Sequence, residues 1–242
     1  MIDLYYYTSP NARKVLIMLE EVGLPYALRW VDITRGDQYE PDFVAISPNS
    51  RIPALVDHDG PGGRRVELFE SGAILMYLAE KSGRLLPADP LDRLDAIKWL
   101  FWQTSSQGPL LGQAAHFVSH AQQRGIRVEY AVERYRNEAE RLYSVLEQRL
   151  EGRTWVAGEY SIADIAAFPW VRVAKGQGVD LERYPRVKQW CEAIAARPAA
   201  RKKPLQDAAT LAAAKTAYYE DRTWDVLFAS KRAKSDPAGT EV

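Results

Sequence analysis

The chain has 242 residues, of which 47% are hydrophobic, and 32 Lys and Arg residues balance 32 Asp and Glu residues. This length fits one large domain or two small ones, and the composition excludes disordered and fibrous proteins. Because the charges balance, no long-range positive field attracts a polyanion or an acidic lipid surface. We therefore expect neither nucleic acid nor a membrane among the partners.

Two further features of the sequence indicate where the protein is located. Residues 1–7 lack the basic region and apolar stretch of a secretory signal, so we expect a cytoplasmic protein. The charge-free segment 99–123 contains polar residues and a Gly108-Pro109 break, which argues against a membrane span. We expect it to line a cleft or a subunit interface.

The sequence contains one cysteine, Cys191, and three histidines. A single cysteine excludes an intramolecular disulfide, a CxxC redox pair and a cysteine zinc site, and we expect it to be a small packed side chain. His116 and His120 have the helical spacing of a metal-binding pair, but no acidic residue lies near them. We therefore expect no metal.

The first 82 residues alternate short β-rich runs with helical patterns. A helix begins at Ser9 or Pro10, follows a 3.6-residue apolar period and stops at Gly23; a later one is capped by Ser71. Residues 37–46 are polar and predict at most a short helical turn. The predicted strands are 2–7, 26–31, 54–57 and 66–69.

This βαβ-ββα order is that of a thioredoxin-like domain, with the first two strands parallel and the last two antiparallel. After the Gly- and Pro-containing segment 83–90, every long run is helical: 91–106, 128–150, 161–174 and 185–197. Ser161 and Asp164 form a Ser-x-x-acid capping box, which is a folding signal. We predict an α+β protein with a thioredoxin-like domain over 1–84, an all-helical domain over 91–230 and a disordered tail over 231–242.

Several motifs in fixed order resemble the glutathione transferases. They are Ile52-Pro53 before a strand, Glu70-Ser71 opening a helix, and the capping box followed by Trp170. Residues 8–11 (TSPN), 47–54 (SPNSRIPA), 68–75 (LFESGAIL) and 99–102 (WLFW) resemble the bacterial Nu-class branch, which is related to the yeast prion-forming nitrogen regulator. This resemblance covers roughly residues 1–200 and implies glutathione as ligand and a homodimer.

Glutathione has an ammonium group, two carboxylates and a thiol, and each end needs a partner. Glu70 suits the ammonium, and Ser71 at a helix start suits the γ-glutamyl carboxylate. The resemblance implies a cis Pro53, which would turn the Ile52 backbone toward an extended peptide. Arg51 can meet the glycyl carboxylate, with Gln38 as a second candidate.

The sulfur end leaves alternatives open. A thiol has a pKa of about 8.5, which hydrogen bonds and the positive end of a helix lower. Ser9 and Asn11 lie at such a helix end, and Tyr7 is their main rival. In the Nu-class pattern position 9 is usually Thr; Ser keeps the hydroxyl and loses a methyl group, so only the rigidity of the donor is in doubt.

A second pocket for the other substrate should be lined by the helical domain and the dimer partner. Its candidate residues are Tyr7, Gln113, Phe117, Arg134 and Trp170. The resemblance implies a glutathione-dependent reductase of disulfides, with weaker conjugation of electrophiles or reduction of peroxides. The alternative is a non-catalytic glutathione-binding regulatory module of the nitrogen-regulator type.

Overall fold

The computed structural model describes residues 1–204 and 220–228, so the tail predicted over 231–242 lies outside the described residues. Its sheet has the strand order β2-β1-β3-β4. Strand β1 is parallel to β2 and antiparallel to β3, and β3 is antiparallel to β4. The strands are β1 (Ile2–Tyr6), β2 (Tyr26–Trp30), β3 (Ala54–Asp57) and β4 (Val66–Phe69). The predicted strand pairing is confirmed.

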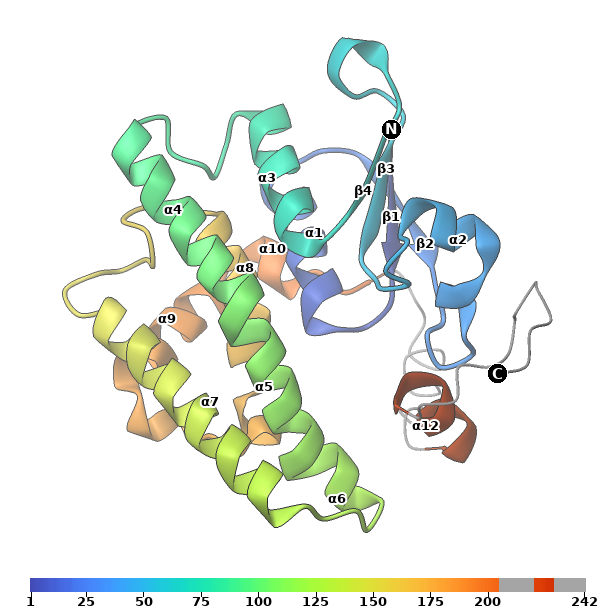
Figure 1. The fold of residues 1–242 in the computed structure, drawn as a ribbon. Helices are drawn as coiled ribbons and strands as arrows, with labels where there is room; N and C mark the ends of the chain where they lie inside the picture. Colours follow the sequence, from blue (N-terminus) through green and yellow to red (C-terminus); the bar gives the residue numbers. More distant parts are fainter. Residues whose placement is uncertain (205–219, 229–242) are drawn as a thin grey trace.

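Helices α1 (Pro10–Val22) and α3 (Ser71–Ser82) cover the face of the sheet that is turned toward the helical half, whereas α2 (Pro41–Ile46) covers the other face (Figure 1). Helix α1 begins where predicted, because Ser9 accepts a hydrogen bond from the Ala12 N–H and Pro10 needs no donor partner at the first position. It ends at Gly23, whose φ of 73° is left-handed.

The prediction for residues 37–46 is wrong. This segment contains a 3₁₀ turn, Asp37–Tyr39, followed by the α2 helix. Phe43 and Ile46, three residues apart, pack against Val31 and the outer face of β3. The burial of these two side chains stabilises a helix whose composition is otherwise polar.

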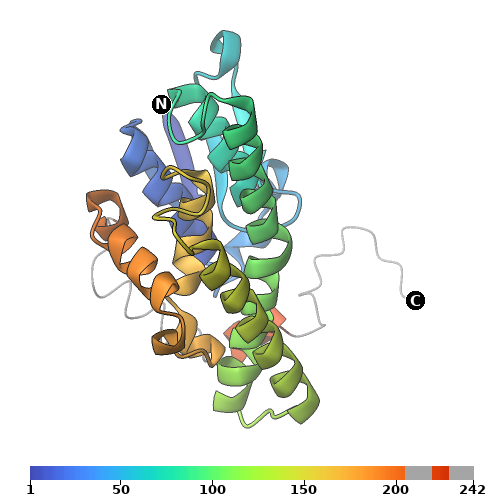
Figure 2. The same ribbon diagram turned by 90° about the vertical axis from the view of Figure 1, so that its left-hand side faces the viewer.

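The second half of the described chain is helical, as predicted. Its elements are α4 (Pro90–Trp102), α5 (Gly108–Ala115), α6 (Ala121–Gln123), α7 (Glu129–Arg149), α8 (Ile162–Val171), α9 (Pro185–Ala195), α10 (Pro198–Arg201) and α12 (Asp221–Phe228), with short 3₁₀ turns at Ala174–Gln177 and Leu181–Arg183. Helices α4, α5 and α6 follow one another as one long rod with α7 beside it (Figures 1 and 2).

The predicted break at Gly108-Pro109 does not occur. The chain passes from α4 into α5 through a π-helical turn, Gln103–Gln107, and a second π-helical turn, His116–His120, joins α5 to α6. Proline cannot donate to a carbonyl in the preceding turn, and a π-turn rearranges the hydrogen bonds around that gap. The helix therefore continues, with Gln103 and Gln107 buried in the turn.

Helix α8 is the central helix of the molecule and packs on α1, α3 and α4. The predicted capping box is confirmed: the Asp164 carboxylate accepts from the Ser161 N–H at 3.0 Å, and Ser161 Oγ accepts from the Ala163 N–H. Asp164 also accepts from the Val156 N–H and from Trp190 Nε1. Burial raises the pKa of Asp164 to about 6 despite these hydrogen bonds.

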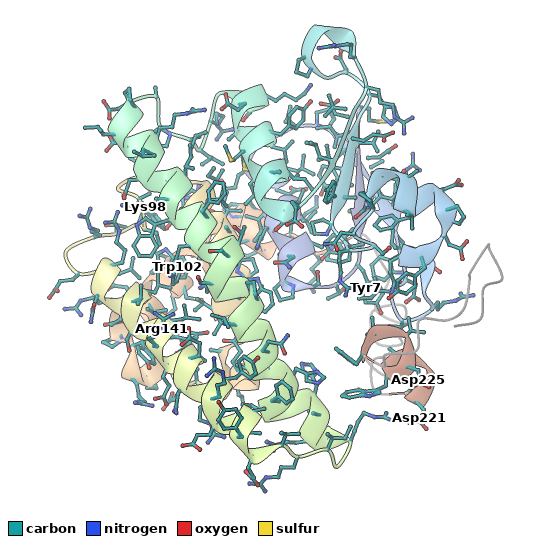
Figure 3. The ribbon with its side chains drawn as sticks, in the orientation of Figure 1. Tyr7, Lys98, Trp102, Arg141, Asp221 and Asp225 are labelled. Carbon is teal, nitrogen blue, oxygen red and sulfur yellow. The ribbon has the colours of Figure 1, made fainter. Side chains whose placement is uncertain are left out.

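Helix α12 connects the two halves at the end of the sheet near Tyr7 (Figure 3). The ring of Trp224 stacks on His116 at 5.4 Å between centroids, and Thr223 Oγ1 donates to the Thr34 carbonyl. No helix among residues 1–204 and 220–228 is long and apolar enough to cross a membrane. Within the same residues, no three His, Cys, Asp or Glu side chains are grouped as metal ligands.

Candidate active site

The start of α1 carries Ser9 and Asn11, the two residues predicted for the sulfur end. Ser9 Oγ accepts from the Ala12 N–H at 3.1 Å, which leaves the hydroxyl hydrogen available to a ligand. Asn11 Oδ1 accepts from Trp170 Nε1 at 3.0 Å. Since this contact occupies the carbonyl side of the amide, the NH₂ group of Asn11 is left as the donor. The positive end of α1 and two donors thus lie together.

Tyr7, the rival, follows β1 at the end of the sheet near α12 (Figure 3). Its ring packs on Trp30 at 4.8 Å between centroids, and its hydroxyl is buried beside Thr34 and Asp32. Burial and, secondarily, the Asp32 charge raise the Tyr7 pKa to about 12. A weaker acid is a weaker donor to a thiolate, and Asp32 opposes a second negative charge there.

The start of α3 differs from the prediction in one respect. Ser71 does not cap the helix: Glu70 occupies the cap position and Ser71 is the first helical residue. Glu70 has a φ of 70°, a conformation that is rare for a side chain of this size and typical of ligand sites. The Ser71 hydroxyl oxygen instead accepts from Lys14 Nζ at 3.1 Å. Its own hydrogen is free to donate to an anion.

The loop before β3 presents the peptide group expected to bind the ligand backbone. The Ile52-Pro53 bond is cis, as the resemblance implied. Within residues 1–204 and 220–228, the N–H and C=O of Ile52 form no backbone hydrogen bond, because the ladder begins at Ala54. Ser47, fully buried, donates from its hydroxyl to the Arg51 carbonyl at 2.9 Å and fixes this loop. The Arg51 side chain is exposed.

Gln38 lies in the 3₁₀ turn after β2 and is 1% exposed. Neither its amide oxygen nor its amide nitrogen has a hydrogen-bond partner in the described part of the chain. Buried amides are almost always paired, and no contact among the described residues explains why this one is not. The side chain is closed to the surface in this conformation, so a role for Gln38 at the glycyl carboxylate stays a prediction.

The other four candidates for a second pocket, besides Tyr7, do not form one group. Phe117 stacks on Tyr135 with parallel rings 5.5 Å apart. Gln113 is exposed on α5, and Arg134 is exposed on α7, where its charge acts on Glu138. Trp170 contacts Asn11 and the backbone of α5 near Gly108 and Gly112, so it positions the sulfur end instead of lining a distant wall.

Sequence reasoning missed Lys14, which is 1% exposed between α1, α3 and the first π-turn. Its ammonium donates to Ser71 Oγ and, at 2.6 Å, to Gln103 Oε1. Burial lowers its pKa to about 7, partly opposed by the nearby Glu70 charge. Residues 15–19, which follow it, are buried all round the helix, but no local pattern distinguishes Lys14 from an exposed helical lysine.

Cys191 is buried on α9, as predicted, and burial raises the pKa of its thiol to about 11. It is therefore a protonated thiol at neutral pH and a poor nucleophile. Any sulfur chemistry at the α1 terminus must use a sulfur that the ligand brings.

Comparison with known proteins agrees with this arrangement. Residues 8–81 match the N-terminal domain and residues 112–198 the C-terminal domain of glutathione S-transferase. The disulfide-bond oxidoreductase YfcG of Escherichia coli is 51% identical over 82% of this chain and 92% of its own length. The protein URE2 of Candida glabrata is 34% identical over 79% of this chain and 64% of its own.

A solved structure extends the comparison to a bound ligand. The glutathione transferase of Pseudomonas putida, crystallised with one glutathione disulfide per subunit, superposes with a TM-score of 0.78 and is 45% identical. The match covers 82% of this chain and 88% of that one. Both domain models, the sequence identities and the shared fold lead to one conclusion: this chain belongs to the glutathione S-transferase family.

Proposed function

We propose that this protein reduces disulfides with glutathione and that Ser9 and Asn11 hold the reacting thiolate. The observation that carries this proposal is the geometry of the α1 terminus. There the hydroxyl hydrogen of Ser9 is free and the amide of Asn11 is oriented by Trp170, and the site contains no cysteine. The raised pKa of the buried Cys191 thiol argues against this residue as the nucleophile. YfcG, named for disulfide-bond oxidoreduction, and the disulfide-bound Pseudomonas putida enzyme support the choice of substrate.

The remaining site residues bind the rest of glutathione. The Glu70 carboxylate receives the ligand ammonium, and the Ser71 hydroxyl and the α3 backbone receive the γ-glutamyl carboxylate. The Ile52 peptide group pairs with the cysteinyl backbone of glutathione, as an added strand would. Arg51 and the unpaired Gln38 amide receive the glycyl carboxylate.

The reaction consists of two thiol-disulfide exchanges. A glutathione thiolate attacks one sulfur of the substrate disulfide, which forms a mixed disulfide and releases the other sulfur as a thiolate that takes up a proton. A second glutathione thiolate then attacks the glutathione sulfur of the mixed disulfide. The products are glutathione disulfide and the second substrate thiol. The protein lowers the thiolate pKa through Ser9, Asn11 and the α1 terminus.

The same thiolate accounts for weaker activities. Attack on an electrophilic carbon conjugates glutathione, and attack on a peroxide oxygen reduces the peroxide, so we include both as side reactions. The second substrate would contact Tyr7, Gln113, Phe117, Arg134 or Trp170, the residues expected from the sequence. We further infer that the chain is of the Nu class, because its short motifs at 8–11 and 47–54 resemble that branch.

We also propose a cytoplasmic homodimer. Leu91, Leu94 and Phe101 are 77%, 61% and 60% exposed and lie on one face of α4, at spacings of three and ten residues. Figure 3 shows Lys98, from the same face, pointing away from the sheet. Such a surface is typical of a subunit interface, and a second copy of the chain is the partner. A reducing compartment supplies the reduced glutathione that the reaction consumes.

A coupled assay tests the function. The protein, glutathione and bis(2-hydroxyethyl) disulfide are mixed with glutathione reductase and NADPH, and NADPH consumption reports glutathione disulfide. We expect turnover well above the uncatalysed exchange. Glutathione binding by calorimetry without turnover would contradict the reductase and favour the regulatory module.

A further inference from the structure

Lys14 is a buried lysine, and neither its packing nor an ion pair explains why a lysine is found at this position. Lysine is almost never fully buried unless it is paired. Among residues 1–204 and 220–228, no carboxylate lies within salt-bridge distance of its ammonium; its partners are the neutral Ser71 hydroxyl at 3.1 Å and the neutral Gln103 amide at 2.6 Å. A methionine, whose side chain is one atom shorter, would fill most of this space without the desolvation cost.

The surrounding elements aim the ammonium at the start of α3. Gln103 holds it from the π-turn, and Gly72 lets α3 approach this turn, because a Cβ atom there would lie 2.9 Å from the Thr104 methyl group. Ser71 accepts from Lys14 and must therefore turn its own hydrogen away from Lys14. That hydrogen and the N–H groups of the first turn of α3 lie at the positive end of the helix.

We propose that Lys14 is a positioning residue that supplies the positive charge for the γ-glutamyl carboxylate through the Ser71 hydroxyl. This inference rests on the proposed function, which places that carboxylate at Ser71. A chain of two hydrogen bonds, from ammonium to hydroxyl and from hydroxyl to carboxylate, polarises the hydroxyl and strengthens its bond to the anion.

Binding of the anion should also change the protonation of Lys14. Its pKa in the free protein is about 7, because burial outweighs the opposing Glu70 charge. Glu70 is the charged group that acts on it from α3; the π-turn contributes the neutral Gln103, and Asp164 of α8 is held by the capping box. A carboxylate at Ser71 favours the Lys14 ammonium and raises its pKa, and it acts through a direct chain of hydrogen bonds, whereas the ligand ammonium at Glu70 opposes only part of this rise; ligand binding therefore takes up a proton above pH 7.

The test uses calorimetric titrations with S-methylglutathione, which has no thiol to titrate, and with its analogue that lacks the γ-glutamyl carboxylate. For the unaltered protein, Kd for S-methylglutathione should rise with pH between 7 and 8, by up to about fivefold. Titrations at pH 7.5 in two buffers of different ionisation enthalpy should show proton uptake. The analogue, which keeps the ammonium but lacks the carboxylate, should show no proton uptake.

Lys14→Met provides the second readout. At pH 6.5 we expect about tenfold weaker binding of S-methylglutathione, less than twofold change for the analogue, and a Kd that no longer depends on pH between 7 and 8. Lys188→Met, which removes a partly exposed lysine of α9 that pairs with Glu182, is the matched control and should behave as the unaltered protein. Thermal melts of both variants check folding.

The outcomes separate the two proposals. If the unaltered protein binds S-methylglutathione without proton uptake, or if folded Lys14→Met keeps its affinity and pH dependence, this inference is overturned and the proposed function stands. If the unaltered protein does not bind S-methylglutathione at all, the proposed function is wrong, and this inference, which rests on it, is wrong too. The buffer titrations need no variant, so they decide the question even if Lys14→Met does not fold.

Discussion

The hydrogen bond from Trp170 to Asn11 gives a sharp test of the proposed thiolate site. Trp170→Phe keeps an aromatic ring against α5 and removes the indole N–H that holds the Asn11 carbonyl at 3.0 Å. Without it, the amide can rotate and present its oxygen to the thiolate. The net free energy of such a neutral hydrogen bond is about 0.5 to 1.5 kcal/mol. We expect that free energy to appear as lost thiolate stabilisation.

The expected shifts follow from this free energy. At about 1.4 kcal/mol per unit, the pKa of the bound glutathione thiol should rise by about 0.4 to 1 unit. In the range where the thiolate limits the rate, kcat/KM should fall about 2- to 12-fold, and the pH-rate profile should move to higher pH. Ultraviolet absorbance of the bound thiolate against pH measures the pKa directly.

The matched control is Trp99→Phe. Trp99 Nε1 is buried without a hydrogen-bond partner in the described chain, so this change removes an indole N–H that orients nothing. It should leave the thiolate pKa in place. If Trp170→Phe folds, as a thermal melt would show, and its thiolate titrates as in the unaltered protein, then Asn11 is not a thiolate donor oriented by Trp170.

Three further changes test the remaining assignments. Glu70→Ala should weaken glutathione binding by about 1.5 to 3 kcal/mol, roughly 10- to 150-fold in Kd by calorimetry, since a hydrogen bond to a charged group is lost; unchanged affinity would reject this role. Cys191→Ser should retain turnover, and inactivity of a folded variant would place the nucleophile on the protein. Removing Ser9 and Asn11 donors together, as alanines, should raise the thiolate pKa, whereas Tyr7→Phe should not; the opposite pattern would transfer the role to Tyr7.

Local signals in the sequence were sufficient for much of the fold. The Ser9-Pro10 start of α1, its stop at Gly23 and the capping box at Ser161 each depend on residues within four positions of one another. The strand pair 54–57 and 66–69 follows from short β-rich runs around a Gly-rich turn. Such features do not depend on the path of the rest of the chain, so neighbouring residues are enough to predict them.

What the sequence did not reveal depends on distant contacts. The α2 helix is stabilised by burying Phe43 against the sheet, and the positive φ of Glu70 has no local pattern. Lys14 resembles a solvent-exposed helical lysine until α3 and the π-turn are packed against it. The Trp170 contact joins residues 159 positions apart. Each of these depends on tertiary packing that a window of neighbouring residues cannot contain.

These distant contacts also explain why the helical half matters to a site built on the thioredoxin-like half. Asn11 and Ser71 lie at the starts of α1 and α3, and each is fixed by one polar contact that leads to the helical half: Asn11 by Trp170, and Ser71 through Lys14 by Gln103. Both contacts determine which atom of a small side chain remains free to donate. A site set in advance in this way binds its ligand at a smaller entropic cost. The π-turn that carries Gln103 therefore supports the proposed binding site through Lys14, although no residue in it is proposed to touch glutathione.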